Sequence, residues 1–236
     1  MITGQSINLN CHNVYIVYYP GYSGGKFLIN CLALSRHCVL QDKDRINLSV
    51  EEKFRVLDHE LDIVLGKATA DNYVAGTWSD FRMGCDSLFN NKYDPESYPA
   101  VVTELTNGER LFFVIAHIPE DLDKLLGIWH NAKVICFNRG FKFVSWRTSP
   151  AFAMTLIQGY RSVPPRQEEV LNWSADWFLD RERFMNEIKY LYTDMGLDDF
   201  NPALVEWFYN KYMQALTKLK TGNFENDIDL QRQSNY

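Results

Sequence analysis

The chain has 236 residues, of which 46% are hydrophobic and 23% charged, and its formal net charge is −6. These values are typical of a globular protein with a sizeable core, and they predict a single domain over residues 1–236. The negative charge disfavours a general nucleic-acid binder, which would usually be basic. No apolar run reaches the roughly eighteen residues of a membrane span, so we expect no membrane partner.

The cysteines and the ends of the chain contain no targeting or crosslinking signal. The five cysteines show neither CxxC spacing nor a disulfide framework, and Cys31 and Cys136 lie inside apolar runs that are typical of core residues. Residues 1–13 form a polar lead-in without the features of a signal peptide, and residues 222–236 are expected to be a loose tail. We therefore expect a cytoplasmic protein.

The first strong signal is a strand, a glycine-rich turn and a helix. Val14 to Tyr19 are β-branched and aromatic, which predicts a buried strand, and apolar residues at helical spacing predict a helix over 27–34. Such a unit points backbone N–H groups and a helix N-terminus at one spot, which favours an anion such as a phosphate. An ordinary strand-to-helix turn is the alternative interpretation.

This turn differs from the Walker pattern of nucleotide triphosphatases. Gly21 is one residue too close to Gly25-Lys26, and Phe27 stands where Ser or Thr would hold magnesium. Lys26 supplies a positive charge, and Ser23 supplies a hydroxyl donor. A magnesium-dependent hydrolase is therefore disfavoured, and no metal site is predicted.

A βαβ crossover is predicted in the middle of the chain. Two apolar strands, over 111–116 and 132–137, flank an amphipathic helix over 119–129. In parallel sheets ligands bind beyond the carboxyl ends of the strands. Because they follow predicted strands, we expect Tyr19, His117 and Arg139 to gather on one rim.

Shorter signals complete the prediction of an α/β protein with a helical C-terminal third. Ser49 and Glu52 form a capping box at the start of a helix that reaches residue 65. The remaining assignments are strands over 73–78 and 101–105, loops over 81–100 and 162–169, and helices over 140–158 (interrupted at 149–150), over 174–195 and from 201 onward.

Several blocks of the chain resemble the sulfotransferases that use 3′-phosphoadenosine 5′-phosphosulfate (PAPS). That family has a strand ending in Tyr-Pro before a phosphate loop, and here Tyr19-Pro20 precede Ser23-Gly24-Gly25-Lys26-Phe27. Its Lys-Thr-His-Leu-Pro block is similar to Ile115-Ala116-His117-Ile118-Pro119, and its strand ending near Arg-Asn is similar to residues 131–142. The 22-residue separation of His117 from Arg139 is also common in that family.

The resemblance implies a fold, a reaction and a set of roles. The fold would be a three-layer α/β/α P-loop architecture with a central, mostly parallel sheet. A sulfuryl group would pass from PAPS to a hydroxyl or amine of a small-molecule or glycan acceptor, leaving adenosine 3′,5′-bisphosphate, with no metal required. His117 would be the general base, and Lys26 would replace the family's catalytic lysine. Arg139 would hold the 3′-phosphate together with Ser145 or Arg147. The 5′-phosphosulfate would contact Gly21, Tyr22, Ser23, Gly24, Gly25, Lys26 and Phe27.

Two other functions compete with this one. A P-loop small-molecule kinase would need magnesium ligands, and the chain has no Ser or Thr after Lys26. A nucleotide-binding protein that has lost catalysis is favoured by the replacement of the family's lysines, with Gly21-Tyr22 at one position and Ile115 at the other. His117 and Arg139 also have simpler interpretations, as a hydrogen-bonded core histidine and as a partner of a surface carboxylate.

Overall fold

The computed structural model describes residues 13–19, 23–39, 48–65, 67, 110–117, 119–148, 150–160 and 170–221. The assignments over 73–78, 81–100, 101–105 and 162–169, the lead-in before residue 13 and the tail 222–236 lie outside these residues. The strands are β1 (Val14–Tyr18), β2 (Phe112–Ala116), β3 (Lys133–Arg139) and β4 (Val170–Ser174). The helices are α1 (Gly25–Ala33), α2 (Val50–Leu65), α5 (Pro119–Ile128), α6 (Phe141–Arg147), α7 (Pro150–Tyr160), the 3₁₀ helix η3 (Ala175–Leu179), α8 (Arg181–Asp194) and α9 (Pro202–Thr221).

The described strands form one parallel sheet in the order β2-β1-β3-β4. Tyr18, the last residue of β1, pairs with Ala116 at the end of β2 and with Cys136 in β3. Strands β1 and β2 are buried along their whole length, as their unbroken apolar runs predict. The predicted α/β class is confirmed.

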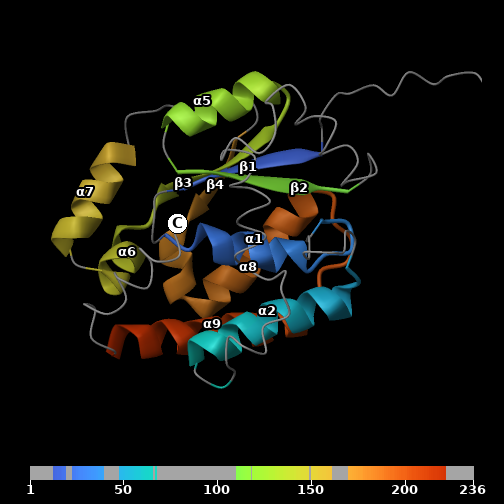
Figure 1. The fold of residues 1–236 in the computed structure, drawn as a ribbon, viewed down its shortest axis with the longest axis vertical. Helices are drawn as coiled ribbons and strands as arrows, with labels where there is room; N and C mark the ends of the chain where they lie inside the picture. The colour runs from blue at the N-terminus through green and yellow to red at the C-terminus, as the bar shows by residue number, and fades with distance from the viewer. Residues whose placement is uncertain are drawn as a thin grey trace, which may run out of the picture.

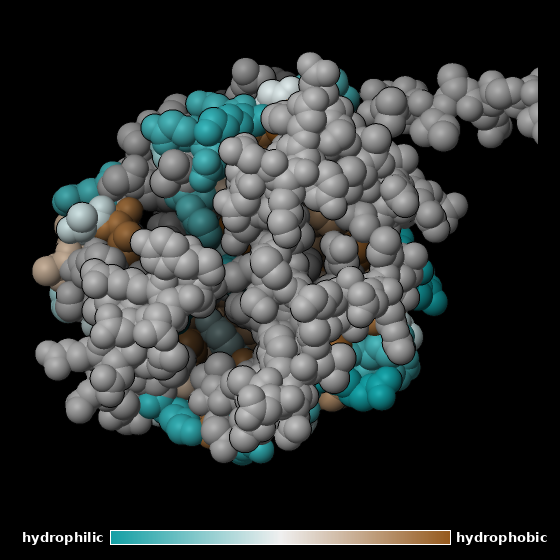
Figure 2. Space-filling view, in the orientation of Figure 1, coloured by the Kyte–Doolittle hydropathy of each residue, from teal (hydrophilic) through white to brown (hydrophobic). Residues whose placement is uncertain are grey.

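Helices cover both faces of this sheet (Figure 1). Helix α5 packs on β1 and β2 from one side, and α1 packs on β1 from the other, with α8 beside it. Helices α2 and α9 pack on each other beyond α1 and form an outer layer. Figure 2 shows hydrophilic side chains over α5 and α2, as expected for helices that bury one face only. None of the described helices is long and apolar enough to cross a membrane.

Two local outcomes show what the sequence pattern could and could not predict. The capping box is confirmed, because the Ser49 amide donates to Glu52 Oε2 at 2.9 Å and the Glu52 amide donates to Ser49 Oγ at 3.2 Å. Strand β4 was not predicted, and the helical interpretation from residue 174 is wrong at its first residue. This short strand pairs with β3 and is only partly buried at its start, so it has no continuous apolar run.

Helix α1 is fixed at its first turn by an aromatic stack. Phe27 is 1% exposed, and its ring lies parallel to that of Tyr212 with 3.8 Å between the ring centroids. The Phe208 ring also stacks on Phe27, with 5.3 Å between the ring centroids. The residue that replaces the Walker Ser or Thr therefore holds α1 against α9, because its ring is buried in contact with two rings of that helix.

The C-terminal end of α1 is anchored by a buried cation. Lys53 Nζ donates to Ser35 O at 2.6 Å and to Cys38 O at 2.5 Å, just after the helix. Burial lowers the pKa of Lys53 to about 8. A cation at this end complements the negative end of the helix dipole. Tyr192 adds a hydrogen bond from its hydroxyl to Cys31 O at 2.7 Å. The opposite end of α1, its N-terminus, lies at the carboxyl edge of the sheet, because α1 follows β1 in the chain.

Candidate functional site

The predicted rim exists as a backbone arrangement. Tyr19 follows β1 and His117 follows β2, and these strands end level with each other. Arg139 is the last residue of β3, whose Cys136 is level with Tyr18. The three residues therefore lie at the same carboxyl edge of the sheet. The Arg139 side chain, like Gly21 and Tyr22, is outside what the structure describes.

His117 is held in one orientation by Tyr19. Its Nδ1 lies 3.1 Å from Tyr19 O, and the two rings meet edge to face at 4.7 Å and 86°. A carbonyl oxygen only accepts hydrogen bonds, so Nδ1 must carry the proton. In the neutral imidazole the lone pair is then on Nε2, which makes Nε2 the nitrogen able to accept a proton. The residue is exposed, so a reacting group can approach it.

The start of α1 is built like an anion site. Its N-cap is Gly24, which has no side chain to cap the first amides and adopts φ 82°, a conformation that favours glycine. The first turn contains no acidic residue, and Lys26 lies half-buried within it. The first turn of a helix carries partial positive charge, so this end of α1 favours an anion. Ser23 is buried beside it.

Helix α6 brings Arg147, and not Ser145, to the α1 side. A Cβ on Gly24 would lie 3.3 Å from the Phe143 ring, and Arg147 Cζ lies 5.9 Å from the centroid of that ring. Burial raises the pKa of Tyr212, whose ring stacks on Phe27. The positive charge of Arg147 opposes part of this rise, because Arg147 lies near Tyr212. Ser145 instead donates its hydroxyl to Lys142 O at 3.0 Å.

The turn into α6 is clamped by a residue that the sequence did not single out. Asp176 Oδ1 accepts from the Phe143 amide at 2.9 Å, so a carboxylate of the chain itself occupies the start of α6. The same turn is closely packed, because a Cβ on Gly140 would lie 2.6 Å from Ala175 Cβ. Nothing in the sequence pairs residues 33 positions apart. The start of α1 differs, because its cap is a glycine and its own first turn contains no acidic residue.

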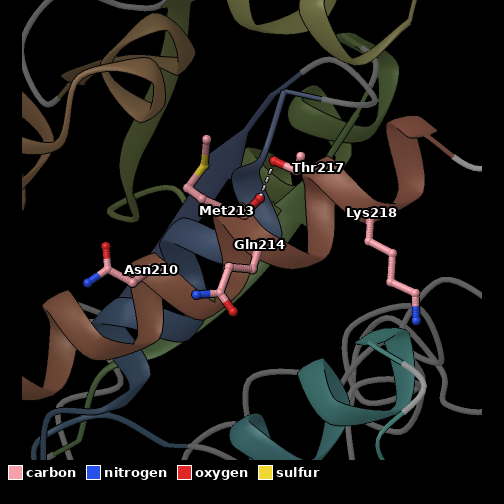
Figure 3. Close-up of a pocket in the computed structure, with 5 residues that line it drawn as sticks. All are labelled: Asn210, Met213, Gln214, Thr217 and Lys218. Carbon is pink, nitrogen blue, oxygen red and sulfur yellow. Dashed lines mark hydrogen bonds between the residues drawn. The ribbon is translucent and has the colours of Figure 1, made fainter.

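Two pockets are lined by described residues other than those of this rim. One, of about 720 Å³, is lined by Asn210, Met213, Gln214, Thr217 and Lys218, all of which project from α9 (Figure 3). The other, of about 240 Å³, lies where α1 ends and α9 begins and includes Arg36, Tyr192 and Asp199. None of the residues predicted for phosphate binding or catalysis lines either pocket.

One cluster of metal-binding residue types occurs at the opposite end of α1. Ligand atoms of His37, Asp198 and Asp199 lie within 4.8 Å of one another. Protein groups already bond these carboxylates, because Arg36 Nη2 lies 3.1 Å from Asp198 Oδ1 and Ser35 Oγ donates to Asp199 Oδ1 at 2.6 Å. The hydrogen bond with His37 lowers the pKa of Asp198. The sequence showed no metal spacing here because His37 and the two carboxylates are more than 160 positions apart.

No family model matches the sequence, and no curated protein matches it. Among solved structures, the fold is similar to the sulfotransferase STF9 from Mycobacterium avium, with a TM-score of 0.46 and 12% sequence identity. The alignment covers 86% of this chain and 68% of the other. A similarity of this size decides nothing about the reaction, which is therefore inferred from this chain's own residues.

The close packing at Gly24 leads to a first prediction. Gly24→Ala combines the cost of φ 82°, roughly 1–2 kcal/mol, with a Cβ placed 2.7 Å from the Phe178 ring. Gly196→Ala is the matched control, because Gly196 has φ 72° but no atom within 4 Å of its Cβ position. We expect Gly24→Ala to destabilise the protein more than Gly196→Ala in urea unfolding. Equal losses for the two variants would contradict the described packing.

Proposed function

We propose that this protein is a sulfotransferase that moves a sulfuryl group from PAPS to a hydroxyl or amine acceptor, with His117 as the general base. The observation that carries the proposal is the hydrogen bond of His117 Nδ1 to Tyr19 O, at the rim where α1 begins. It leaves the lone pair of the neutral ring on Nε2. The blocks around Tyr19, His117 and Arg139 that resemble the PAPS-dependent family support the same function.

The start of α1 fits the 5′-phosphosulfate of the donor. The amides of Gly25, Lys26 and Phe27 belong to a first turn that has a glycine cap and no acidic residue. The Lys26 ammonium adds a positive charge to the same turn. Lys53 holds the other end of the helix in place through its hydrogen bonds to Ser35 O and Cys38 O.

Arg147 is the stronger candidate for the 3′-phosphate beside Arg139. It lies on the side of α6 that contacts Gly24 through Phe143, whereas the Ser145 hydroxyl bonds its own helix. A guanidinium offers paired N–H donors that suit a phosphate. We therefore assign the 3′-phosphate to Arg139 and Arg147.

The chain's residues would act on the reaction in two ways. PAPS, when bound, supplies the sulfuryl group. His117 Nε2 takes the proton of the acceptor as the acceptor oxygen or nitrogen bonds to sulfur. The first-turn amides of α1 and Lys26 stabilise the negative charge that passes to the 5′-phosphate as its bond to sulfur breaks.

The side chain of Phe27 argues against the kinase alternative. Magnesium in P-loop kinases is held by a hydroxyl at this position, and here the position is a ring buried against Tyr212 and Phe208. A measurement of sulfuryl transfer distinguishes an active sulfotransferase from a binding protein that has lost catalysis.

Calorimetry with adenosine 3′,5′-bisphosphate tests donor binding. We expect binding without metal, stronger than that of ATP with magnesium. Lys26→Met should weaken binding about tenfold or more, since a charge-assisted contact is worth roughly 1.5–3 kcal/mol. The control Lys124→Met, at an exposed position of α5, should bind like the unchanged protein. Preference for ATP with magnesium, or no binding of either nucleotide, would refute the proposal.

Substitution of His117 tests catalysis. Release of adenosine 3′,5′-bisphosphate from PAPS is measured with a panel of phenols, alcohols and amines. We expect His117→Ala to lose about 10²–10⁴-fold in turnover, the usual contribution of a general base, while it still binds the bisphosphate. His130→Ala is the control, because His130 is an exposed histidine beyond α5. Bisphosphate binding with no turnover in the unchanged protein would favour the binding protein, and unchanged turnover in His117→Ala would exclude His117 as the base.

A further inference from the structure

We propose that Tyr19 is a positioning residue whose ring sets the distance between His117 and the start of α1. This inference rests on the proposed function, in which those two groups are the base and the anion site. Two sets of contacts support this inference, one made by the main chain of Tyr19 and the other by its ring.

The main chain of Tyr19 is bound to the strand and the residue that present the base. Its amide donates to Ala116 O at 3.1 Å, which fixes it to the end of β2. Its carbonyl accepts from His117 Nδ1 at 3.1 Å, one residue further along. The orientation and the tautomer of His117 therefore follow from where Tyr19 lies.

The ring of Tyr19 fills the space between three neighbours. Tyr19 is 3% exposed, and its ring meets the edge of His117 at 4.7 Å and lies 5.5 Å from Phe137 in β3. On the α1 side the ring lies directly over Gly25: a Cβ there would be 2.2 Å from Cδ1, 2.3 Å from Cγ and 2.4 Å from Cε1. One rigid ring thus contacts both the base and the first residue of the helix.

This contact explains why residue 25 is glycine. Gly25 is the first residue of α1, and it is not among the glycines with positive φ, which are Gly24, Gly140 and Gly196 in the described part of the chain. Its backbone conformation would suit alanine, which is also the better helix former by about 1 kcal/mol. What excludes a side chain is the Tyr19 ring. Residues 19 and 25 are therefore a matched pair.

The consequence for the reaction is a coupling between the two parts of the site. If the ring is pushed away from Gly25, it moves against His117, and the base shifts relative to the first-turn amides. A misplacement of about 1 Å is enough to reduce a reaction about 10²-fold.

The test combines two conservative substitutions with a signal from His117 itself. Nitrogen-15 NMR of the imidazole reports whether Nδ1 carries the proton and whether its surroundings change. Tyr19→Phe keeps the ring and should leave both the His117 signal and turnover close to those of the unchanged protein. Gly25→Ala should shift the His117 signal and lower turnover about 10²-fold. Gly127→Ala, where an added Cβ meets nothing within 4 Å, is the control and should shift neither.

The outcomes separate this inference from the proposed function. A folded Gly25→Ala variant with an unchanged His117 signal would overturn the inference, whatever the turnover. A shifted His117 signal in a protein that neither binds the bisphosphate nor transfers sulfate would retain the coupling and refute the function. If Gly25→Ala does not fold, Tyr19→Leu is measured instead, because it keeps the main-chain contacts and an apolar side chain but removes the ring. It should shift the His117 signal, and an unchanged signal would overturn the inference.

Discussion

The stacking of Phe27 on Tyr212 fixes helix α1, and the candidate site depends on where α1 begins. This contact holds the helix against α9, and Lys53 holds its C-terminal end by bonding the carbonyls that follow it. The helix is therefore held near both of its ends, and its glycine-capped N-terminus lies at the rim of the sheet. A fixed helix start has little freedom to lose on binding, and preorganisation of this kind favours affinity for an anion.

The proposed chemistry follows from the carboxyl edge of three adjacent strands. Strand β1 places Tyr19 between the other two, β2 delivers His117 and β3 ends at Arg139. A parallel register brings these positions together although they are far apart in the chain. The lysine that the resembled family carries after Tyr-Pro is replaced here, and Lys26 lies instead within the first turn of α1. In our proposal Lys26 supplies the positive charge at the phosphate that the other lysine supplies in that family, from a different position in the chain.

The parts of the fold that could be predicted from the sequence are those encoded locally. The apolar runs of β1, β2 and β3 and the Ser49–Glu52 capping box each carry their own signal. Strand β4 could not be predicted, because its half-buried residues lack a clear period. Contacts between residues that are distant in the sequence could not be predicted either. Asp176 caps α6 from 33 positions away, and the glycine at residue 25 has a reason only once the Tyr19 ring is seen over it. The sequence could name Ser145 and Arg147 as alternatives, but only the packing of α6 separates them.

We propose that the start of α1 and His117 form one site, and a crystal structure with adenosine 3′,5′-bisphosphate bound would test this. We expect the 5′-phosphate within hydrogen-bond distance of the Gly25 and Lys26 amides, on the side of the rim that carries His117. We expect the 3′-phosphate beside Arg139 and Arg147. A nucleotide bound in the α9 pocket, or bound without contact to the first turn of α1, would contradict it.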